Sequence, residues 1–154
     1  MILCCVGKCG WQNDSLLARI KKHQRYGKTL FLWNDLGDDE LAFCYQHAQM
    51  LLFASYAEGF GLPIIEGLHF GLPVMASDIP VHREVGKKNI EYFDLSDCSD
   101  LVRKIEVKER EGFADANDAL VIQPWNNWKQ SAHSLMRQVA AFDQSVPSIQ
   151  SSFT

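Results

Sequence analysis

Two glutamates flank a glycine-rich turn in the middle of the sequence, and these residues are the best placed to do chemistry. Glu58 and Glu66 stand eight positions apart, and the segment between them contains Gly59, Gly61 and Pro63. Glycine lets a backbone bend and approach a ligand closely, and proline suits the first position of a helix. Backbone N–H groups at the start of that helix would then point at a ligand in the turn. The segment therefore predicts a site for a phosphate or polyhydroxy ligand, with carboxylates that accept from sugar or ribose hydroxyls.

Each glutamate also has a purely structural explanation. Glu66 in the first turn of the expected helix would complement the helix dipole, which is worth a few tenths to about 1 kcal/mol. Glu58 would then be a solvated turn residue. The ordered Gly-Phe-Gly-Leu-Pro sequence between the two glutamates favours the functional interpretation.

Two further segments carry weaker signals. Lys8 lies in a Gly-x-x-Gly turn, which is weak evidence for a phosphate contact because any tight turn after a strand has this pattern. His82, Arg83 and Glu84 follow Pro80, and we expect them to be mainly structural, with Arg83 paired to an acidic neighbour.

Composition places the chain among ordinary globular α/β proteins. It has 154 residues, of which 47% are hydrophobic and 22% charged, as expected of one domain with a real core. A net charge of −4 without a basic stripe argues against nucleic acid as a partner. No apolar run is long enough to span a membrane, and no basic leader precedes the first strand, so we expect a cytoplasmic protein with at most peripheral contact at the inner membrane face.

The five cysteines do not indicate a metal or disulfide framework. Their number is odd and no Cys-x-x-Cys pair occurs among Cys4, Cys5, Cys9, Cys44 and Cys98. Free thiols in a reducing compartment are the expected state. We therefore predict no metal site.

Short apolar strands alternate with helix patterns along the chain. Strands are expected at 2–6, 29–33, 50–54, 73–77 and 90–93, and helices at 14–26, 38–48, 63–70 and 97–110. We expect the strand at 2–6 to be buried, and a last helix to follow Pro124 over 125–142. This alternation predicts a Rossmann-like parallel sheet with helices on both faces. Residues 1–143 would form the domain, and the serine-rich end at 144–154 a disordered tail.

The predicted topology gathers polar and glycine residues at one edge of the sheet. In open parallel sheets, ligands bind beyond the carboxyl ends of the strands. The loops expected there are 7–11, 33–37, 55–62 and 77–80. This convergence is a second argument for a site, independent of the glutamate motif.

A series of motifs in a fixed order makes the sequence resemble a known family. It is similar to the carboxyl-terminal, donor-binding half of GT-B glycosyltransferases of the family 4 type, and to bacterial mannosyltransferase-like enzymes of surface-polysaccharide assembly in particular. The resemblance covers residues 2 to about 135. The matching segments are 6–11, 38–41 with Tyr45 and Ala48, 58–67 with its E-x7-E element, 71–74, 76–80, 83–85 and 128–132.

The resemblance implies a retaining hexosyltransferase that uses a nucleotide-sugar such as GDP-mannose and needs no cofactor or metal. Glu58 would be the catalytic-site carboxylate and contact hydroxyls of the donor sugar. Glu66 would accept from ribose hydroxyls. The remaining donor-binding residues would be Gly7, Lys8, Trp33, Asn34, Gly59, Phe60, Gly61 and Leu62, with Trp33 and Asn34 bordering the base and the N–H groups of the last three facing sugar and diphosphate.

The sequence departs from this family in two ways. It has no counterpart of the amino-terminal acceptor domain, and its first strand matches the second strand of the donor domain. The first strand is central in the usual doubly wound order, so its loss would expose unpaired backbone groups. Either the existing strands close up or another chain fills the place, and a homo-oligomer through the exposed edge is one form this takes.

These departures leave more than one function open. We expect the chain alone to be inactive as a transferase and to need the missing acceptor domain or a partner chain. The alternative is a non-catalytic nucleotide-sugar-binding or assembly module that works with a partner. A sugar-nucleotide epimerase on the same scaffold is a third hypothesis, and it would need a complete two-domain cleft as well.

Overall fold

The computed structural model describes residues 1–8, 10, 13–113 and 132–137. The chain divides into two parts, residues 1–120 and 121–154, and each is taken by itself. Of the second part only the helical residues 132–137 are described. Most of the helix predicted at 125–142, and the tail predicted at 144–154, therefore lie outside the described residues.

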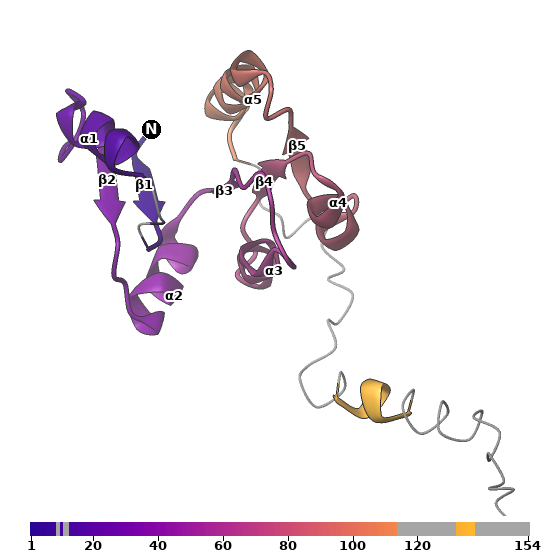
Figure 1. Ribbon diagram of the computed structural model, residues 1–154. Coiled ribbons are helices and arrows are strands. Elements are labelled where there is room, and N and C mark those ends of the chain that lie inside the picture. Colours follow the sequence, from indigo (N-terminus) through magenta and orange to yellow (C-terminus); the bar gives the residue numbers. More distant parts are fainter. Residues whose placement is uncertain (9, 11–12, 114–131, 138–154) are drawn as a thin grey trace, which may run out of the picture. The chain divides into compact units, whose positions relative to one another are not determined.

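The first half of residues 1–120 contains a two-stranded parallel sheet (Figure 1). Strand β1 (Leu3–Val6) pairs with β2 (Leu30–Trp33) in the register Leu3 to Leu30. Helix α1 (Asp14–Lys22) connects the two strands, and α2 (Asp38–His47) follows β2.

Helix α1 ends earlier than the sequence predicts. The prediction extended it to residue 26, but His23 has an extended backbone, with φ −68° and ψ 137°. Beyond it the chain turns, and Tyr26 forms an isolated parallel bridge with Leu30. Pairing with the start of β2 therefore replaces the last turn of the predicted helix.

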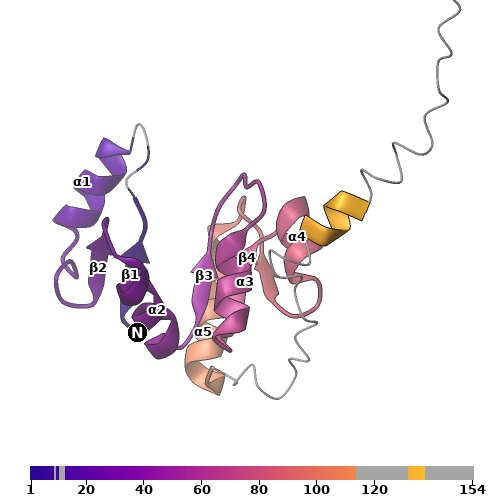
Figure 2. The same cartoon turned by 90° about the horizontal axis from the view of Figure 1, so that it is seen from below.

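The second half contains a three-stranded parallel sheet in the order β3-β4-β5. Its elements are β3 (Leu51–Phe53), α3 (Leu62–His69), β4 (Val74–Ser77), α4 (Pro80–Gly86), β5 (Glu91–Phe93) and α5 (Cys98–Glu111). Helix α3 packs against β3 and β4, α5 packs against β5, and helices lie on both sides of the strands (Figure 2). The predicted Rossmann-like α/β class is confirmed.

The hydrophobic core lies in this second sheet. It consists of Ile64, Leu68, Val74, Ala76, Val85 and Ile90. All four residues of β4 are buried, as expected for a parallel strand paired on both sides. Gly67 lets α3 approach the sheet, because a Cβ atom there would lie 2.8 Å from Leu51 Cδ2.

The strand at the beginning of the chain is exposed, so the prediction that it is buried is wrong. Leu3 is 40% and Val6 41% exposed. Strand β1 pairs only with β2, and β3 pairs only with β4. In the described part of the chain, therefore, no strand lies along the outer edge of β1, and the strands have not closed up into one sheet.

Candidate functional site

The loop between β3 and α3 has the geometry that its glycines suggested. Gly61 is the N-cap residue of α3 and has a left-handed backbone, with φ 77° and ψ 43°. Residues with a Cβ atom rarely adopt this conformation, so glycine is strongly favoured there. Helix α3 begins at Leu62, one residue earlier than predicted, so Glu66 lies in the second turn and not in the first. The alternative structural explanation, that Glu66 complements the helix dipole from the first turn, is therefore wrong.

The loop offers backbone donors and a carboxylate at the surface. Within the described residues, the N–H groups of Phe60, Gly61 and Leu62 donate no hydrogen bond. These groups stand at the amino end of an eight-residue helix, where anions are favoured. Glu58 and Phe60 are both exposed. The loop can therefore bind an anionic ligand through its backbone while Glu58 accepts from hydroxyl groups.

Glu66 is held in place by a residue from a different helix. The Tyr45 hydroxyl of α2 donates a 2.8 Å hydrogen bond to Glu66 Oε2. Tyr45 is buried and stacks on Phe70, with ring centroids 5.4 Å apart. Burial and the hydrogen bond to Glu66 raise the pKa of Tyr45, so its hydroxyl stays protonated and donates. The bond fixes the carboxylate and leaves Oε1 for a ligand.

A buried histidine lies beneath the loop. The ring of His82 is fully buried, and its Nδ1 lies 2.9 Å from the Ser77 carbonyl oxygen. If Nδ1 carries the proton and donates to that oxygen, Nε2 is left as an acceptor. Nε2 has no partner among the described atoms, and it lies 3.9 Å from the position of a Cβ atom built on Gly61. The structural role expected of His82 is therefore to pack beneath the loop, where its ring lies next to Gly61.

The sequence did not reveal either supporting contact. Tyr45 is separated from Glu66 by 21 positions. His82 stands in a helix of seven residues after β4. Val81 precedes His82 and Val85 lies three positions after it, a spacing that could have indicated a buried helix face, but nothing in the sequence indicates what His82 contacts.

The structure places the remaining predicted site residues at the carboxyl ends of β1 and β2. Gly7 and Lys8 follow β1, and Trp33 ends β2 just before Asn34. The Gly7 N–H donates to the Trp33 carbonyl at 3.1 Å, so these two loops lie side by side. Across the described ranges, no hydrogen bond or ion pair joins them to the 58–62 loop. The predicted site residues therefore lie in two groups, one at the β1–β2 sheet and one at the β3-β4-β5 sheet.

An ion pair follows β4 at the same edge as the glycine loop. Arg83 donates two hydrogen bonds of 2.6 Å to the carboxylate of Asp78. The hydrogen bonds from Arg83 lower the pKa of Asp78. The expected pairing of Arg83 with an acidic neighbour is confirmed.

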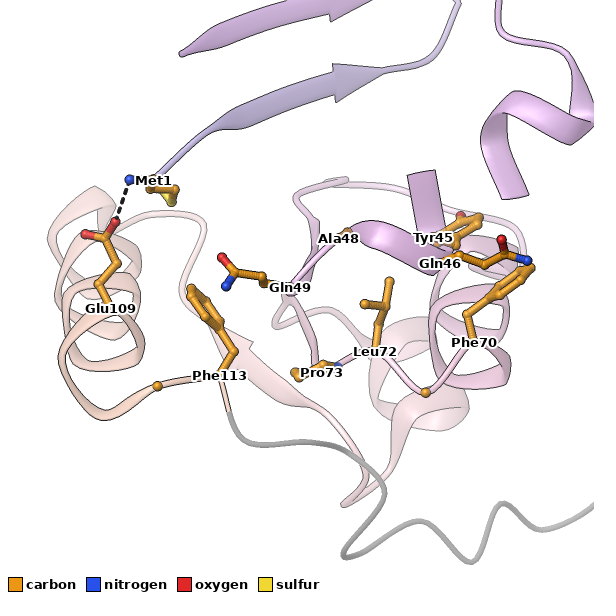
Figure 3. A pocket seen from close by; sticks show the side chains of 12 residues that line it. Met1, Tyr45, Gln46, Ala48, Gln49, Phe70, Leu72, Pro73, Glu109 and Phe113 are labelled. Carbon is orange, nitrogen blue, oxygen red and sulfur yellow. Dashed lines mark ion pairs between the residues drawn. The ribbon is translucent and has the colours of Figure 1, made fainter. Parts of the chain in front are cut away.

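The pocket in Figure 3 lies at the opposite edge of the strands. It has a volume of about 640 Å³ and is lined by residues that precede β1, β3 and β4 or follow α5, among them Met1, Gln49, Pro73 and Phe113. The amino group of Met1 lies 3.3 Å from a Glu109 oxygen at its rim. Ligands of open parallel sheets bind at the carboxyl ends of strands, so this pocket is not the predicted donor site.

Other kinds of site have little support in the described residues. They contain no group of three metal-ligating side chains. Cys4, Cys5, Cys44 and Cys98 are free thiols. Within the described ranges, every helix is too short or too polar to cross a membrane.

Parallel strands that alternate with helices, together with a glycine loop before a helix at the carboxyl end of a strand, define a Rossmann-like α/β domain of the ligand-binding type. Comparison with known proteins then identifies the family. The chain belongs to the family described as glycosyl transferases group 1, whose model matches residues 1–135.

Relatives with curated descriptions are bacterial. The chain is 37% identical over 134 residues to the serotype-specific mannosyltransferase WbdA of Escherichia coli. The aligned segment covers 87% of this chain and 16% of that protein. It is 34% identical over 79 residues to O-antigen chain mannosyltransferase B of Escherichia coli, covering 51% and 20% of the two chains. It is 39% identical over 70 residues to O-antigen chain mannosyltransferase RfbU of Salmonella typhimurium, covering 46% and 20%. The chain therefore spans about a fifth or less of these relatives.

Proposed function

We propose that this chain is the donor-binding part of a retaining glycosyltransferase that takes a sugar from a nucleotide-sugar. The observation that carries the proposal is the loop of residues 58–62, which presents free N–H groups at the start of α3 beside the exposed carboxylate of Glu58. Membership of the glycosyl transferases group 1 family supports it. The acceptor would be a glycan or a lipid-linked glycan in surface-polysaccharide assembly, at the cytoplasmic side of the membrane.

The loop has the electrostatic properties that this reaction needs. When the bond between sugar and diphosphate breaks, negative charge grows on the leaving diphosphate. The N–H groups of Phe60, Gly61 and Leu62 are fixed by the left-handed turn at Gly61, so they stabilise that charge without rearranging. Glu58 would accept from hydroxyls of the donor sugar, and the remaining oxygen of Glu66 from ribose hydroxyls.

Mannose is the sugar we propose, with GDP-mannose as the donor. The support is that relatives matching this chain are described as mannosyltransferases. Gly7, Lys8, Trp33 and Asn34 would complete the donor site from the carboxyl ends of β1 and β2, with the last two bordering the base.

The Glu66 assignment is tested by calorimetric titration of GDP-mannose into the full chain and its variants. Glu66→Gln keeps the shape of the side chain and removes its charge, and we expect it to weaken binding roughly tenfold, which corresponds to about 1.4 kcal/mol. Glu84→Gln is the matched control, because Glu84 is exposed on α4 and has no hydrogen bond or ion pair among the described residues. Equal affinities of the two variants would contradict the assigned role.

A second candidate function is a nucleotide-sugar-binding or assembly module without catalysis, which works with a partner chain. It is favoured by β1 and β3, each of which pairs on one side only within the described residues. A sugar-transfer assay of the chain with GDP-mannose separates the candidates. We expect no turnover by the chain alone in either case and turnover after addition of an acceptor-binding partner only if the chain is part of an enzyme.

A further inference from the structure

Two buried polar residues hold the loop of residues 54–61 at both of its ends. At the start of the loop, the hydroxyl of Ser77, the last residue of β4, donates to the Ser55 carbonyl oxygen. At the end of the loop, Gly61 lies against the ring of His82, because a Cβ atom built on Gly61 would be 3.4 Å from His82 Cδ2. Ser77 and His82 are both fully buried. Neither residue belongs to the loop, so its two ends are fixed from outside.

Ser77 and His82 also contact each other. His82 Nδ1 lies 2.9 Å from the Ser77 carbonyl oxygen and 3.1 Å from the Ser77 hydroxyl oxygen. A carbonyl oxygen only accepts, so Nδ1 carries the proton, and the hydroxyl proton of Ser77 goes to the Ser55 carbonyl. The contacts therefore form a closed network, which runs from Ser55 through Ser77 and His82 to Gly61.

The ring of His82 has little freedom to move. The ring of Phe53 in β3 packs against it, with centroids 5.0 Å apart, and the His82 carbonyl accepts from the Tyr92 hydroxyl at 3.2 Å. Side chains packed in this way stay in one rotamer on the time average. The left-handed turn at Gly61 thus rests on a fixed surface.

A ring that only filled space beneath the loop would not need to be polar. Nε2 of His82 is buried and has no hydrogen-bond partner among the described atoms. An unpaired buried acceptor costs free energy, and a leucine or phenylalanine would avoid that cost. What histidine adds at this position is the Nδ1–H group, which bonds Ser77. The polar network therefore explains why the residue beneath Gly61 is a histidine.

We propose that Ser77 and His82 are positioning residues, which hold the loop of residues 54–61 ready for the diphosphate of a nucleotide-sugar. Neither residue touches the ligand. Ser77 fixes the start of the loop and His82 fixes the turn at Gly61, so the free N–H groups at the start of α3 meet the diphosphate without first being ordered. The ligand class rests on the proposed function, whereas the coupling of the pair to the loop does not.

Backbone ¹⁵N relaxation of the full chain without ligand tests the coupling. Ser77→Ala removes the hydrogen bond to Ser55 and takes away only one oxygen atom. We expect the order parameters of Phe60 and Gly61 to fall from about 0.85 toward about 0.6, the range of flexible backbone. Val85→Ala is the matched control, because Val85 is a buried core residue of the same helix as His82. It should lower stability and leave the order of the loop unchanged.

His82 is tested by its ring ¹⁵N shifts and by two variants. In the wild type we expect a proton on Nδ1 and none on Nε2. His82→Leu cannot donate to Ser77 and should loosen the loop as Ser77→Ala does. In His82→Asn the amide nitrogen is as many bonds from Cα as Nδ1 is, so this variant should recover part of the order, which a role in apolar packing alone would not predict.

Calorimetric titration with GDP measures the effect on ligand binding. Ser77→Ala and His82→Leu should each weaken binding roughly tenfold, and Val85→Ala should leave it nearly unchanged. The double variant should bind little more weakly than either single variant, because the two residues act as one unit.

Three results would overturn the proposal. They are an unchanged order of Gly61 in both Ser77→Ala and His82→Leu, a proton on Nε2 in place of Nδ1, and equal loosening in Val85→Ala, which would reduce the pair to ordinary core packing. A wild-type chain that does not bind GDP would overturn the proposed function and the ligand class. The coupling of the pair to the loop would then still stand or fall on the measurements without ligand.

Discussion

At the scale of single residues, the site depends on Gly61 and on the ring beneath it. Gly61 has a φ of 77°, and a Cβ atom there would lie 3.4 Å from His82 Cδ2. His82 is fully buried and fixed by its contact with the Ser77 carbonyl. The turn that aims the N–H groups of the loop is therefore set by backbone conformation and by a rigid neighbour together.

Gly61→Ala should lower both stability and affinity for a nucleotide-sugar. Forcing a residue with a Cβ atom into the left-handed region costs about 1–2 kcal/mol, and the added methyl group would touch the ring of His82 at 3.4 Å. Gly27→Ala is the matched control, because Gly27 has a φ of 74° but no atom within 4 Å of an added Cβ atom. Urea denaturation should show a loss in both variants, while calorimetry should show roughly tenfold weaker binding of GDP-mannose only in Gly61→Ala. Equal affinities in the two variants would argue against a role for this turn in binding.

The sequence was least informative about the individual residues that hold the site residues in place. Spacing and residue type pointed to Glu58, Glu66 and the glycines, because these residues follow one another in a single segment. The contact from Tyr45 to Glu66 joins two helices, and the contact from His82 to Gly61 joins a helix to a loop. Such contacts depend on how elements pack, so a local pattern does not contain them.

At the scale of elements, α3 lies close to β3 and β4 because Gly67 has no side chain. A Cβ atom at Gly67 would lie 2.8 Å from Leu51 Cδ2 and 3.0 Å from Val74 Cγ2. The helix that carries the glycine loop at its start therefore packs on β3 and β4 through its backbone.

Gly67→Ala should destabilise the chain by about 1–3 kcal/mol, the usual cost of overpacking a core. Both contacted atoms belong to packed side chains, so either these side chains or α3 must shift to make room. Gly59→Ala is the control, because nothing lies within 4 Å of a Cβ atom there. Urea denaturation of the two variants measures the difference, and a Gly67→Ala variant as stable as the wild type would contradict the close packing.

Ion pairs of Asp100 stabilise the beginning of a second element, α5. Asp100 accepts from Lys104 Nζ at 2.6 Å, from Arg103 at 2.5 Å and from the Asp94 N–H at 3.1 Å. The hydrogen bond from Lys104, with those from Asp94 and Arg103, lowers the pKa of Asp100 from 3.8 to about 2. The ionised form is thus favoured in the folded chain.

Acid should remove this stabilisation in a defined range of pH. Because the pKa of Asp100 is lower in the folded chain, its contribution is complete above about pH 4 and is lost as the pH falls from about 4 to about 2. Asp100→Asn should reduce stability at pH 7 and flatten the loss between pH 4 and 2, measured by thermal unfolding. Glu106→Gln, an exposed change on the same helix, should leave the pH profile like that of the wild type. If the stability of Asp100→Asn depended on pH as that of the wild type does, this cluster of charges would not contribute to stability.

Secondary structure could be predicted well from the sequence because apolar periodicity and turn residues are local properties. All five predicted strands were found within one residue at each end, and Asp97, predicted as the first residue of a helix, is the N-cap of α5. The exceptions arise from longer-range causes. Helix α1 ends at Lys22 because Tyr26 bridges Leu30, and the apolar strand β1 is exposed because its outer edge is unpaired.

At the scale of the whole molecule, the described residues among 1–120 form two parallel sheets and not one. The predicted site residues divide between them, with Gly7, Lys8, Trp33 and Asn34 on one and the 58–66 segment on the other.

The central claim is that a nucleotide-sugar binds at the loop that begins α3, and amide chemical shifts during titration of the full chain with GDP-mannose test it most directly. We expect the largest shifts at Phe60, Gly61 and Leu62, whose N–H groups donate no hydrogen bond in the described part of the chain. We expect small shifts at Leu72 and Phe113, which line the pocket at the opposite edge of the strands. Largest shifts at that pocket, or no shift at a saturating concentration of GDP-mannose or of other nucleotide-sugars, would contradict the claim.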